Sequence, residues 1–260
     1  MVQDRFEGHT PLIRLRGLTK RFRRQTIFEN LDLDVYKGEI LGIAGASGTG
    51  KSVLLRTVTG LVEPDAGTIE VFGRDTATLS HSEKLAMERR WGVLFQDGAL
   101  FSSMTVLQNV QVPMREQLKL PRSSMAELAI LKIAMVGLDP SAAHKYPSEL
   151  SGGMRKRAGL ARALALDPEI VFLDEPTSGL DPIAAAAFDR LVKSLSDTLG
   201  LTVYMITHDL DSIFAVCDRV AILADRHIVR DGPPQDMMRD PRHPWVKDYF
   251  CGERARRVPA

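Results

Sequence analysis

The chain has 260 residues, 44% of them hydrophobic, which is enough to bury the core of one large domain or two small ones. Its 34 Lys and Arg residues nearly match its 33 Asp and Glu residues, so the net charge of +1 gives no general reason to expect a nucleic-acid partner. Two cysteines are too few for a disulfide framework and fit a reducing cytosol. No apolar run reaches about 18 residues, so we expect no membrane span within this sequence.

The first part of the chain has the pattern of a β-sheet. Residues 11–44 alternate apolar and polar positions, and a Pro-Asp-Ala-Gly turn at 64–67 leads into a further strand at 68–72. These runs predict a mixed, partly antiparallel sheet. The densest basic stretch, residues 14–24, falls in this region, and a solvated strand and turn is favoured over a phosphate-binding surface.

A nucleotide phosphate loop lies between a strand-like run, 39–44, and a helix-like run, 52–58. Its glycines allow a tight turn that aims backbone N–H groups at phosphate oxygens, and the helix N-terminus adds a partial positive charge. We expect Lys51 to reach the β and γ phosphates and Ser52 to offer its hydroxyl to Mg²⁺. The eight residues of the loop are Gly45, Ala46, Ser47, Gly48, Thr49, Gly50, Lys51 and Ser52.

The pattern becomes mostly helical from about residue 80 to 165, with the clearest helix at 125–136 and Gly137 as its stop. Short β-rich runs separated by helices then follow, which indicates a parallel α/β sheet interrupted by a helical insertion. These runs are 170–173, 202–206 and 220–223. The tail from Asp240 is rich in Pro and Arg, and we expect it to wrap a surface.

Two carboxylates, Asp174 and Glu175, end the apolar run 170–173, where an open parallel sheet places its active-site crevice. Asp174 would hold Mg²⁺ or one of its waters, and Glu175 would orient and polarise the water that attacks the γ-phosphate. A surface acidic pair is the alternative. The presence of the phosphate loop favours the catalytic interpretation.

Three weaker signals accompany these carboxylates. Gln96 follows an apolar run and has the chemistry to act at Mg²⁺ or the attacking water, and His208 follows a strand and could place a ring N–H against the γ-phosphate. Ser151, Gly152 and Gly153 precede a helix predicted from Arg155 toward Leu166, which makes a second anion-binding helix terminus. Two such sites predict either two ligands or head-to-tail pairing of two copies.

In this order, the motifs resemble the ATP-binding subunit of an ABC transporter over about residues 11–240. The resemblance implies an α/β P-loop NTPase fold: a RecA-like core sheet, an antiparallel β-subdomain and an inserted α-helical signature subdomain at about 97–165, with 241–260 as a C-terminal extension. It implies an ATPase that uses ATP and Mg²⁺, with two nucleotides sandwiched in a head-to-tail dimer of two copies. The residues leave the preference for ATP over GTP open.

The resemblance also assigns a role to each motif. Phe22 would stack on adenine, although a core position is the alternative for this ring. The remaining roles are Walker A for 45–52, the Q-loop and a metal ligand for Gln96, the signature for Ser151 to Gly153, Walker B for Asp174, the catalytic base for Glu175, the D-loop for 178–181, and the switch histidine for His208.

Two stretches resemble a narrower branch, the Mla and Mce-type ATPases that energise lipid movement across the bacterial envelope. They are residues 93–106 with 109–110 and 113–116, and residues 150–154 with Arg157. This likeness implies transport of phospholipid or a related lipid, with an integral membrane permease and an Mce-type lipid-binding protein as partners. It also implies a location on the cytoplasmic face of the inner membrane.

Three details of this branch bear on partners. Met154 replaces the Gln common in ABC signatures, which removes an amide but leaves the Ser151 and glycine donors. The apolar segment 99–112 would receive a permease helix, and it also fits a subdomain core. Some relatives carry a C-terminal extension that crosses to the other ATPase, and the aromatic residues of 244–250 are candidates for such a contact.

Three rival functions remain. Within transporters, the alternative is the ATPase of an amino-acid or other solute importer, because this subunit never touches the cargo. A soluble ABC-type ATPase acting on nucleic acid or ribosomes is disfavoured, since no long coiled-coil insertion and no second ATPase unit are seen in the sequence. A catalytically silent subunit is disfavoured because Lys51, Asp174, Glu175 and His208 are all present.

Overall fold

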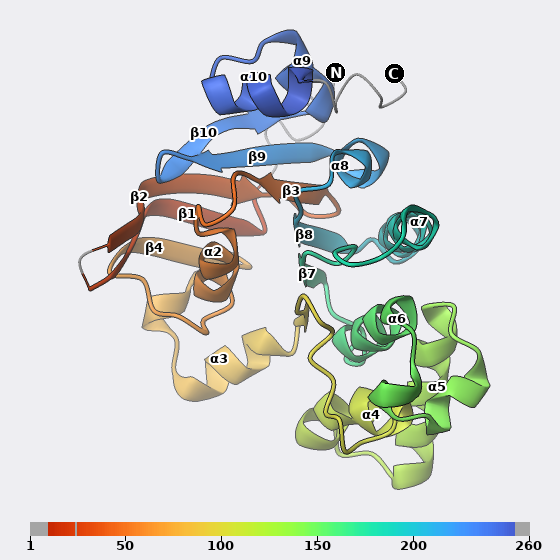
Figure 1. Cartoon of the computed structure of the whole chain (residues 1–260). Helices are drawn as coiled ribbons and strands as arrows, with labels where there is room; N and C mark the ends of the chain where they lie inside the picture. The colour runs from red at the N-terminus through yellow and green to blue at the C-terminus, as the bar shows by residue number, and fades with distance from the viewer. Residues whose placement is uncertain (1–9, 24, 253–260) are drawn as a thin grey trace. The chain divides into compact units, whose positions relative to one another are not determined.

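The computed structural model describes residues 10–23 and 25–252 (Figure 1). The chain forms two compact units. One unit is discontinuous and combines the segments 1–84 and 202–260, and the other is the continuous segment 85–201. The boundary between 84 and 85 falls within the short helix α3 (His81–Glu88).

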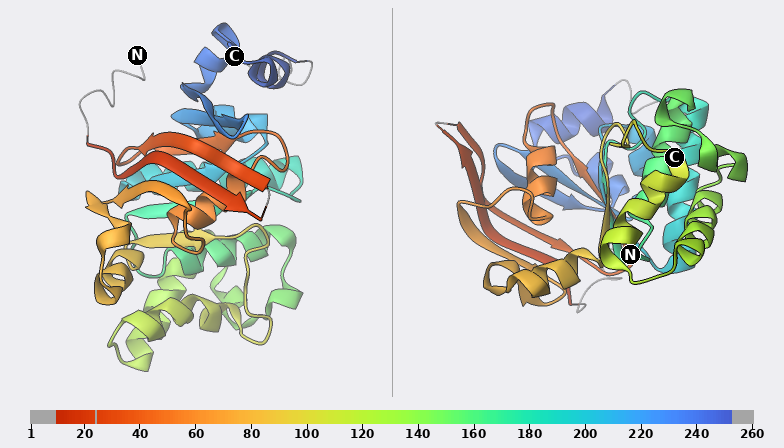
Figure 2. Two further views of the ribbon diagram at one scale, coloured as in Figure 1. Left: turned by 90° about the vertical axis from the view of Figure 1, so that its left-hand side faces the viewer. Right: turned by 90° about the horizontal axis from the view of Figure 1, so that it is seen from below.

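The first unit contains the expected antiparallel sheet, with the strand order β2-β1-β4-β5. Its strands are β1 (Ile13–Phe22), β2 (Gln25–Val35), β4 (Ala66–Val71) and β5 (Arg74–Asp75). Alternating side chains of β1, including Ile13 and Leu15, are fully buried, as one apolar face of such a sheet requires. The two views of Figure 2 show this sheet, in red and orange, as a layer of its own within the unit.

The basic stretch of β1 is neutralised by acidic partners rather than gathered into a free positive patch. Arg16 pairs with Asp34 at 2.7 Å and Arg21 pairs with Glu29 at 2.8 Å. Arg14 and Lys20 have partners of the same kind, Glu70 at 3.2 Å and Asp65 at 3.3 Å. The favoured interpretation, a solvated strand surface, agrees with these ion pairs.

Parallel strands form the second layer of this unit. β3 (Ile40–Ala44) is buried along its whole length and pairs in parallel with β8 (Thr202–Ile206) and β9 (Arg219–Ala224). A continuous apolar run such as Ile-Leu-Gly-Ile-Ala suits a strand that is covered on both faces. The remaining elements are β10 (His227–Gly232), antiparallel to β9, and the helices α2 (Lys51–Val58), α8 (Leu210–Val216), α9 (Pro234–Arg239) and α10 (Pro244–Cys251).

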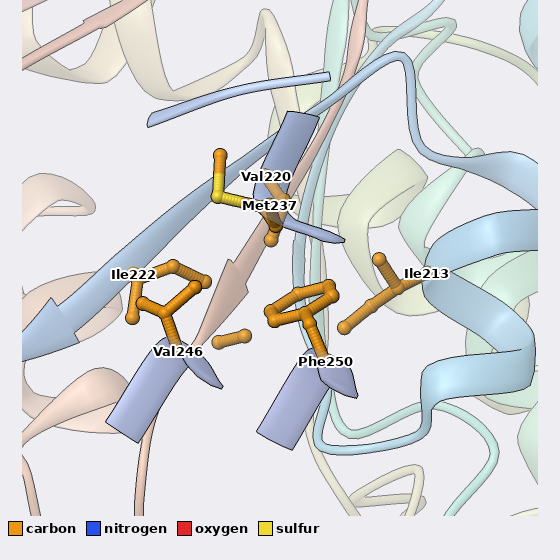
Figure 3. Packing of buried hydrophobic residues seen from close by; sticks show 7 residues of the cluster. Ile213, Val220, Ile222, Met237, Val246 and Phe250 are labelled. Atoms are coloured by element: carbon orange, nitrogen blue, oxygen red, sulfur yellow. The ribbon is translucent and has the colours of Figure 1, made fainter. Parts of the chain in front are cut away.

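The C-terminal tail is helical and packs on its own chain. Val246 and Phe250 of α10 and Met237 of α9 are fully buried against Ile213 of α8 and the strand β9, as Figure 3 shows. Trp245 and Tyr249 stack on each other with ring centroids 4.5 Å apart. The burial of Val246 and Phe250 removes these two side chains from the candidates for contact with a second ATPase, and residues 253–260 lie outside the described residues.

Replacing Phe250 by Ala should lower the free energy of unfolding by about 3–5 kcal/mol, because it leaves a cavity among side chains that are fully buried. A urea titration of the purified chain measures the change. Lys247→Ala on the exposed face of the same helix is the matched control and should stay within about 0.5 kcal/mol. A Phe250 variant as stable as this control would contradict the packing of α10.

The second unit holds two parallel strands and the helical segment. β6 (Trp91–Leu94) pairs with β7 (Ile170–Asp174), and the helices α4, α5 and α6 contact one another (Figure 1). The helices are α4 (Val106–Gln117), α5 (Arg122–Met135), α6 (Gly152–Ala163) and α7 (Pro182–Leu199), joined in part by short 3₁₀ turns at Pro140–His144 and Pro147–Glu149.

Local sequence signals set the ends of these helices. Thr105 and Gln108 form a reciprocal capping box at the start of α4. Asp181 accepts hydrogen bonds from two backbone N–H groups at the start of α7, and Pro182 occupies its first position. Gly137, with φ of 68°, follows the end of α5 as predicted.

Candidate active site

The residues predicted to act on the nucleotide fall into two groups, one in each unit. In the first unit, Gly45 and His208 each lie two residues beyond the paired Ile43 and Ile206 of the parallel strands β3 and β8. The phosphate loop and the histidine therefore leave neighbouring strands at the same end. This is the carboxyl end, where parallel sheets place their ligands.

The phosphate loop has the conformation that its glycines predict. Gly45 has φ of 156°, and a Cβ atom there would lie 2.3 Å from the backbone oxygen of Leu223. Gly50, at the N-cap of α2, has φ of 99° in the left-handed region and has no side chain with which to cap the first turn of the helix. The turn between them exposes Ala46, Ser47 and Gly48.

Lys51 is the first residue of α2, and its side chain folds back over the loop. The Nζ atom donates to the backbone oxygens of Gly45 at 2.8 Å and Ala46 at 2.9 Å, and the residue is only 7% exposed. Thr49 donates from its hydroxyl to the oxygen of Ala46 at 2.9 Å. These bonds hold an ammonium group inside the turn that the sequence assigns to phosphates.

Two further predicted residues of this unit are accessible. His208 follows the buried Thr207 and is exposed, one residue before Asp209, which caps α8. Phe22 ends β1 with 45% of its surface exposed, and the ammonium of Lys20 lies 5.2 Å from the centre of its ring. The alternative core position for Phe22 is therefore wrong.

In the second unit, the strands β6 and β7 bring Gln96 and Glu175 to one end. Each residue lies two positions beyond the paired Leu94 and Leu173. Gln96 is exposed, Asp174 is 6% exposed at the end of β7, and Glu175 is half-buried. Glu175 has φ of 48°, the left-handed region that residues other than glycine rarely adopt.

The signature residues form the N-terminus of α6. Ser151 is the N-cap, and its Oγ atom accepts from the backbone N–H of Met154 at 3.2 Å. Gly152 and Gly153 lie in the first turn rather than before the helix, so α6 starts three residues earlier than predicted and ends at Ala163. The serine cap explains the earlier start, because it satisfies a donor of the first turn.

The apolar segment 99–112 has both buried and exposed side chains. Val106 and Val110 are fully buried in the helical segment, whereas Phe101 is 49% exposed beneath the guanidinium of Arg162, whose central carbon lies 6.0 Å from the ring centre. One side of the segment is core, and Phe101 is left at the surface.

One site-adjacent residue escaped the sequence analysis. Lys156 of α6 donates from Nζ to the backbone oxygens of Gln96 and of Glu175, the latter at 3.0 Å. Burial lowers the pKa of this lysine, while the nearby carboxylates of Asp97, Glu175 and Asp174 act to raise it. The one sequence signal that could have pointed to Lys156 is its spacing from Gly159. The two residues are three positions apart, so they share a helix face, and small residues surround them in the sequence.

Comparison with known proteins identifies the family of this chain. A family model described as ABC transporter matches residues 28–178, a range that includes the phosphate loop, the signature and Glu175. The chain is 39% identical to the intermembrane phospholipid transport system ATP-binding protein MlaF of Escherichia coli strain K12, over 93% of this chain and 89% of that protein. It is also 39% identical to the probable ribonucleotide transport ATP-binding protein mkl of Mycobacterium leprae, over 95% of this chain and 72% of that protein.

Solved structures show the same fold. A dimeric structure of a post-hydrolysis state of the ATP-binding cassette MJ0796, bound to ADP and Pi, matches with a TM-score of 0.78 and 29% identity, over 85% of this chain and 98% of that one. The structure of cbiO1 from Clostridium perfringens, part of the ABC transporter complex cbiONQ, matches with a TM-score of 0.79 and 26% identity, over 89% and 92%. This chain therefore belongs to the ABC transporter family, as one of its ATP-hydrolysing subunits.

Proposed function

We propose that this chain energises the movement of phospholipid or a related lipid across the bacterial envelope, as the ATPase of a membrane-bound transporter. The single observation that carries this proposal is its 39% identity to MlaF over nearly the whole length of both chains. Within residues 10–23 and 25–252, no helix is both long and apolar enough to cross a bilayer. We also propose that this chain binds the cytoplasmic side of an integral membrane permease, with an Mce-type protein to carry the lipid.

The proposed chemistry is electrostatic stabilisation of a transferring phosphoryl group. Lys51 and the backbone N–H groups of the phosphate loop bind the β and γ phosphates, and Phe22 stacks on the base. Glu175 orients and polarises the attacking water, and His208 and Gln96 position the γ-phosphate and the water. Ser151, Gly152 and Gly153 bind the nucleotide held by a second copy, so that two copies pair head to tail around two ATP molecules.

The three residues proposed to hold a magnesium ion all carry oxygen donors, which is the ligand chemistry that this ion requires. Ser52 offers a hydroxyl at the start of α2, Asp174 a carboxylate at the end of β7, and Gln96 a side-chain oxygen. Magnesium is a hard cation that prefers oxygen ligands, and phosphate and water oxygens usually fill its other coordination positions. The ion would neutralise charge on the phosphates.

The names of the two relatives describe different cargoes, phospholipid for MlaF and ribonucleotide for mkl. The cargo is therefore the part of the proposal to test. The complex should be purified from native membranes with its permease and reconstituted in liposomes. ATP hydrolysis and transfer should then be measured with a fluorescent phospholipid and, in parallel, with a labelled ribonucleotide and an amino acid. ATP-dependent transfer of the lipid alone supports the proposal. Transfer of the ribonucleotide or the amino acid would contradict it and show that the cargo is a water-soluble compound.

A further inference from the structure

The helix that begins with the signature residues also contacts the Q-loop through its cations. Arg162 of α6 donates from Nη1 to the backbone oxygen of Ala99 at 2.8 Å and from Nη2 to that of Gly98 at 2.9 Å. Six residues earlier in the helix, Lys156 donates to the backbone oxygen of Gln96. Three carbonyl groups within four residues of the Q-loop are thus bound by two side chains of one helix.

Close backbone packing reinforces these bonds. A Cβ atom on Gly159, between the two cations, would lie 3.1 Å from the Cα atom of Gly98 and 2.6 Å from a methyl group of Leu94. The absence of a side chain at Gly159 therefore lets the helix and the loop approach closely. Lys156 and Arg162 are charged donors, and their hydrogen bonds hold the loop more firmly than bonds from neutral donors would.

Lys156 extends the same attachment to the catalytic strand end. Its Nζ atom also donates to the backbone oxygen of Glu175 at 3.0 Å, and the residue is 5% exposed. Glu175, with φ of 48°, and Ala99, with φ of 47°, both hold left-handed backbone conformations, which are strained for residues other than glycine and persist only where their surroundings impose them. Donors that fix the carbonyl groups in this region are such surroundings.

We infer that Lys156 is a positioning residue for ATP hydrolysis, which sets the side chains of Gln96 and Glu175 together by binding the backbone oxygen of each. The inference rests on the roles proposed above for Gln96 and Glu175. Because Lys156 lies in the helix that Ser151 caps, a nucleotide that engages the signature of this chain acts on the same rigid helix that holds the two residues. Signature occupancy and the geometry of hydrolysis are thereby linked within one chain.

The test compares Lys156→Met with Arg157→Met in the complete transporter complex. Arg157 is a matched control, because it lies on the same helix and also donates to a backbone oxygen, that of Val136 at 2.6 Å, in the helical segment. Loss of positioning by about 1 Å costs on the order of 10²-fold in rate. We expect kcat of Lys156→Met to fall by about that factor with KM for ATP changed less than about threefold, while the kcat of Arg157→Met stays within about twofold.

Two further variants make the outcome decisive. Lys156→Arg keeps the charge and the donors and should recover most of the lost kcat, and a Lys156→Gln variant serves if the Met variant does not fold. Equal kcat values in the Lys156 and Arg157 variants, or no recovery by Arg, would overturn the inference. If Glu175→Gln hydrolyses ATP at the normal rate, the proposed site itself fails. If Glu175→Gln is inactive but Lys156→Met and Lys156→Gln are fully active, only the role of Lys156 fails.

Discussion

Glu175→Gln should lower the turnover of ATP hydrolysis by about 10² to 10⁴-fold while leaving ATP binding nearly unchanged. The amide keeps the size of the side chain but cannot polarise the attacking water. The variant should keep the left-handed backbone at residue 175 and the hydrogen bond from Lys156 to the backbone oxygen there, because neither feature involves the side-chain carboxylate. Phosphate release by the assembled complex and binding of a fluorescent ATP analogue measure the two effects separately.

A second expected consequence of Glu175→Gln is accumulation of a nucleotide-bound dimer, because hydrolysis no longer opens it. Size-exclusion chromatography with ATP and magnesium should show the dimer. The same change at the exposed Glu127 of α5 is the control and should leave turnover and dimerisation as in the natural protein. Normal turnover in Glu175→Gln would remove Glu175 from the role of catalytic base.

Lys51→Ala should reduce kcat/KM for ATP by about 10² to 10³-fold, the loss expected when one preorganised donor to a transferring group is removed. In the structure the ammonium already lies inside the turn, bound to the oxygens of Gly45 and Ala46. When ATP binds, phosphate oxygens would replace these backbone oxygens as partners of the ammonium group. The Lys51 side chain would therefore need to move little in order to bind the phosphates. Isothermal titration calorimetry with ATP and magnesium, together with a steady-state assay, measures the loss.

The exposed Lys37, in the turn before β3, provides the matched control for this second change. Lys37→Ala removes the same charge without touching the loop and should leave the affinity for ATP within about twofold. Unchanged ATP affinity and unchanged kcat/KM in Lys51→Ala would show that the loop binds its ligand without this ammonium. The melting temperature of both variants should be recorded, so that a folding defect is recognised.

Local patterns predicted the parts of the fold that depend on neighbours in sequence. The phosphate loop, the runs that became β3, β7 and β8, and the stop of α5 at Gly137 were all expected from composition, periodicity and glycine placement. The carboxyl ends of β7 and β8 also follow from the sequence, so the positions of Glu175 and His208 at strand ends were predicted. These features need only a few adjacent residues to define them.

Features that depend on tertiary contacts were missed. β6 is only four residues long and pairs with β7, nearly 80 residues later, so its strand character was hidden within a stretch read as mostly helical. The helix α10 was hidden by the Pro- and Arg-rich composition of the tail, although Pro244 is acceptable at its first position. Lys156 contacts the backbone oxygens of Gln96 and Glu175 only because α6 packs against both segments. No local sequence pattern predicts that packing.

The discontinuous make-up of the first unit has a consequence for the biosynthesis of the chain. The strand β3 is complete at Ala44, but its parallel neighbours β8 and β9 begin only at Thr202 and Arg219. The continuous segment 85–201 is synthesised in between, so the apolar strand β3 has no strand partners of its own sheet until that segment has been made. Nascent chains stalled before residue 202 should therefore recruit chaperones, and a stop codon ahead of β9 should yield an aggregating product rather than a smaller nucleotide-binding fragment.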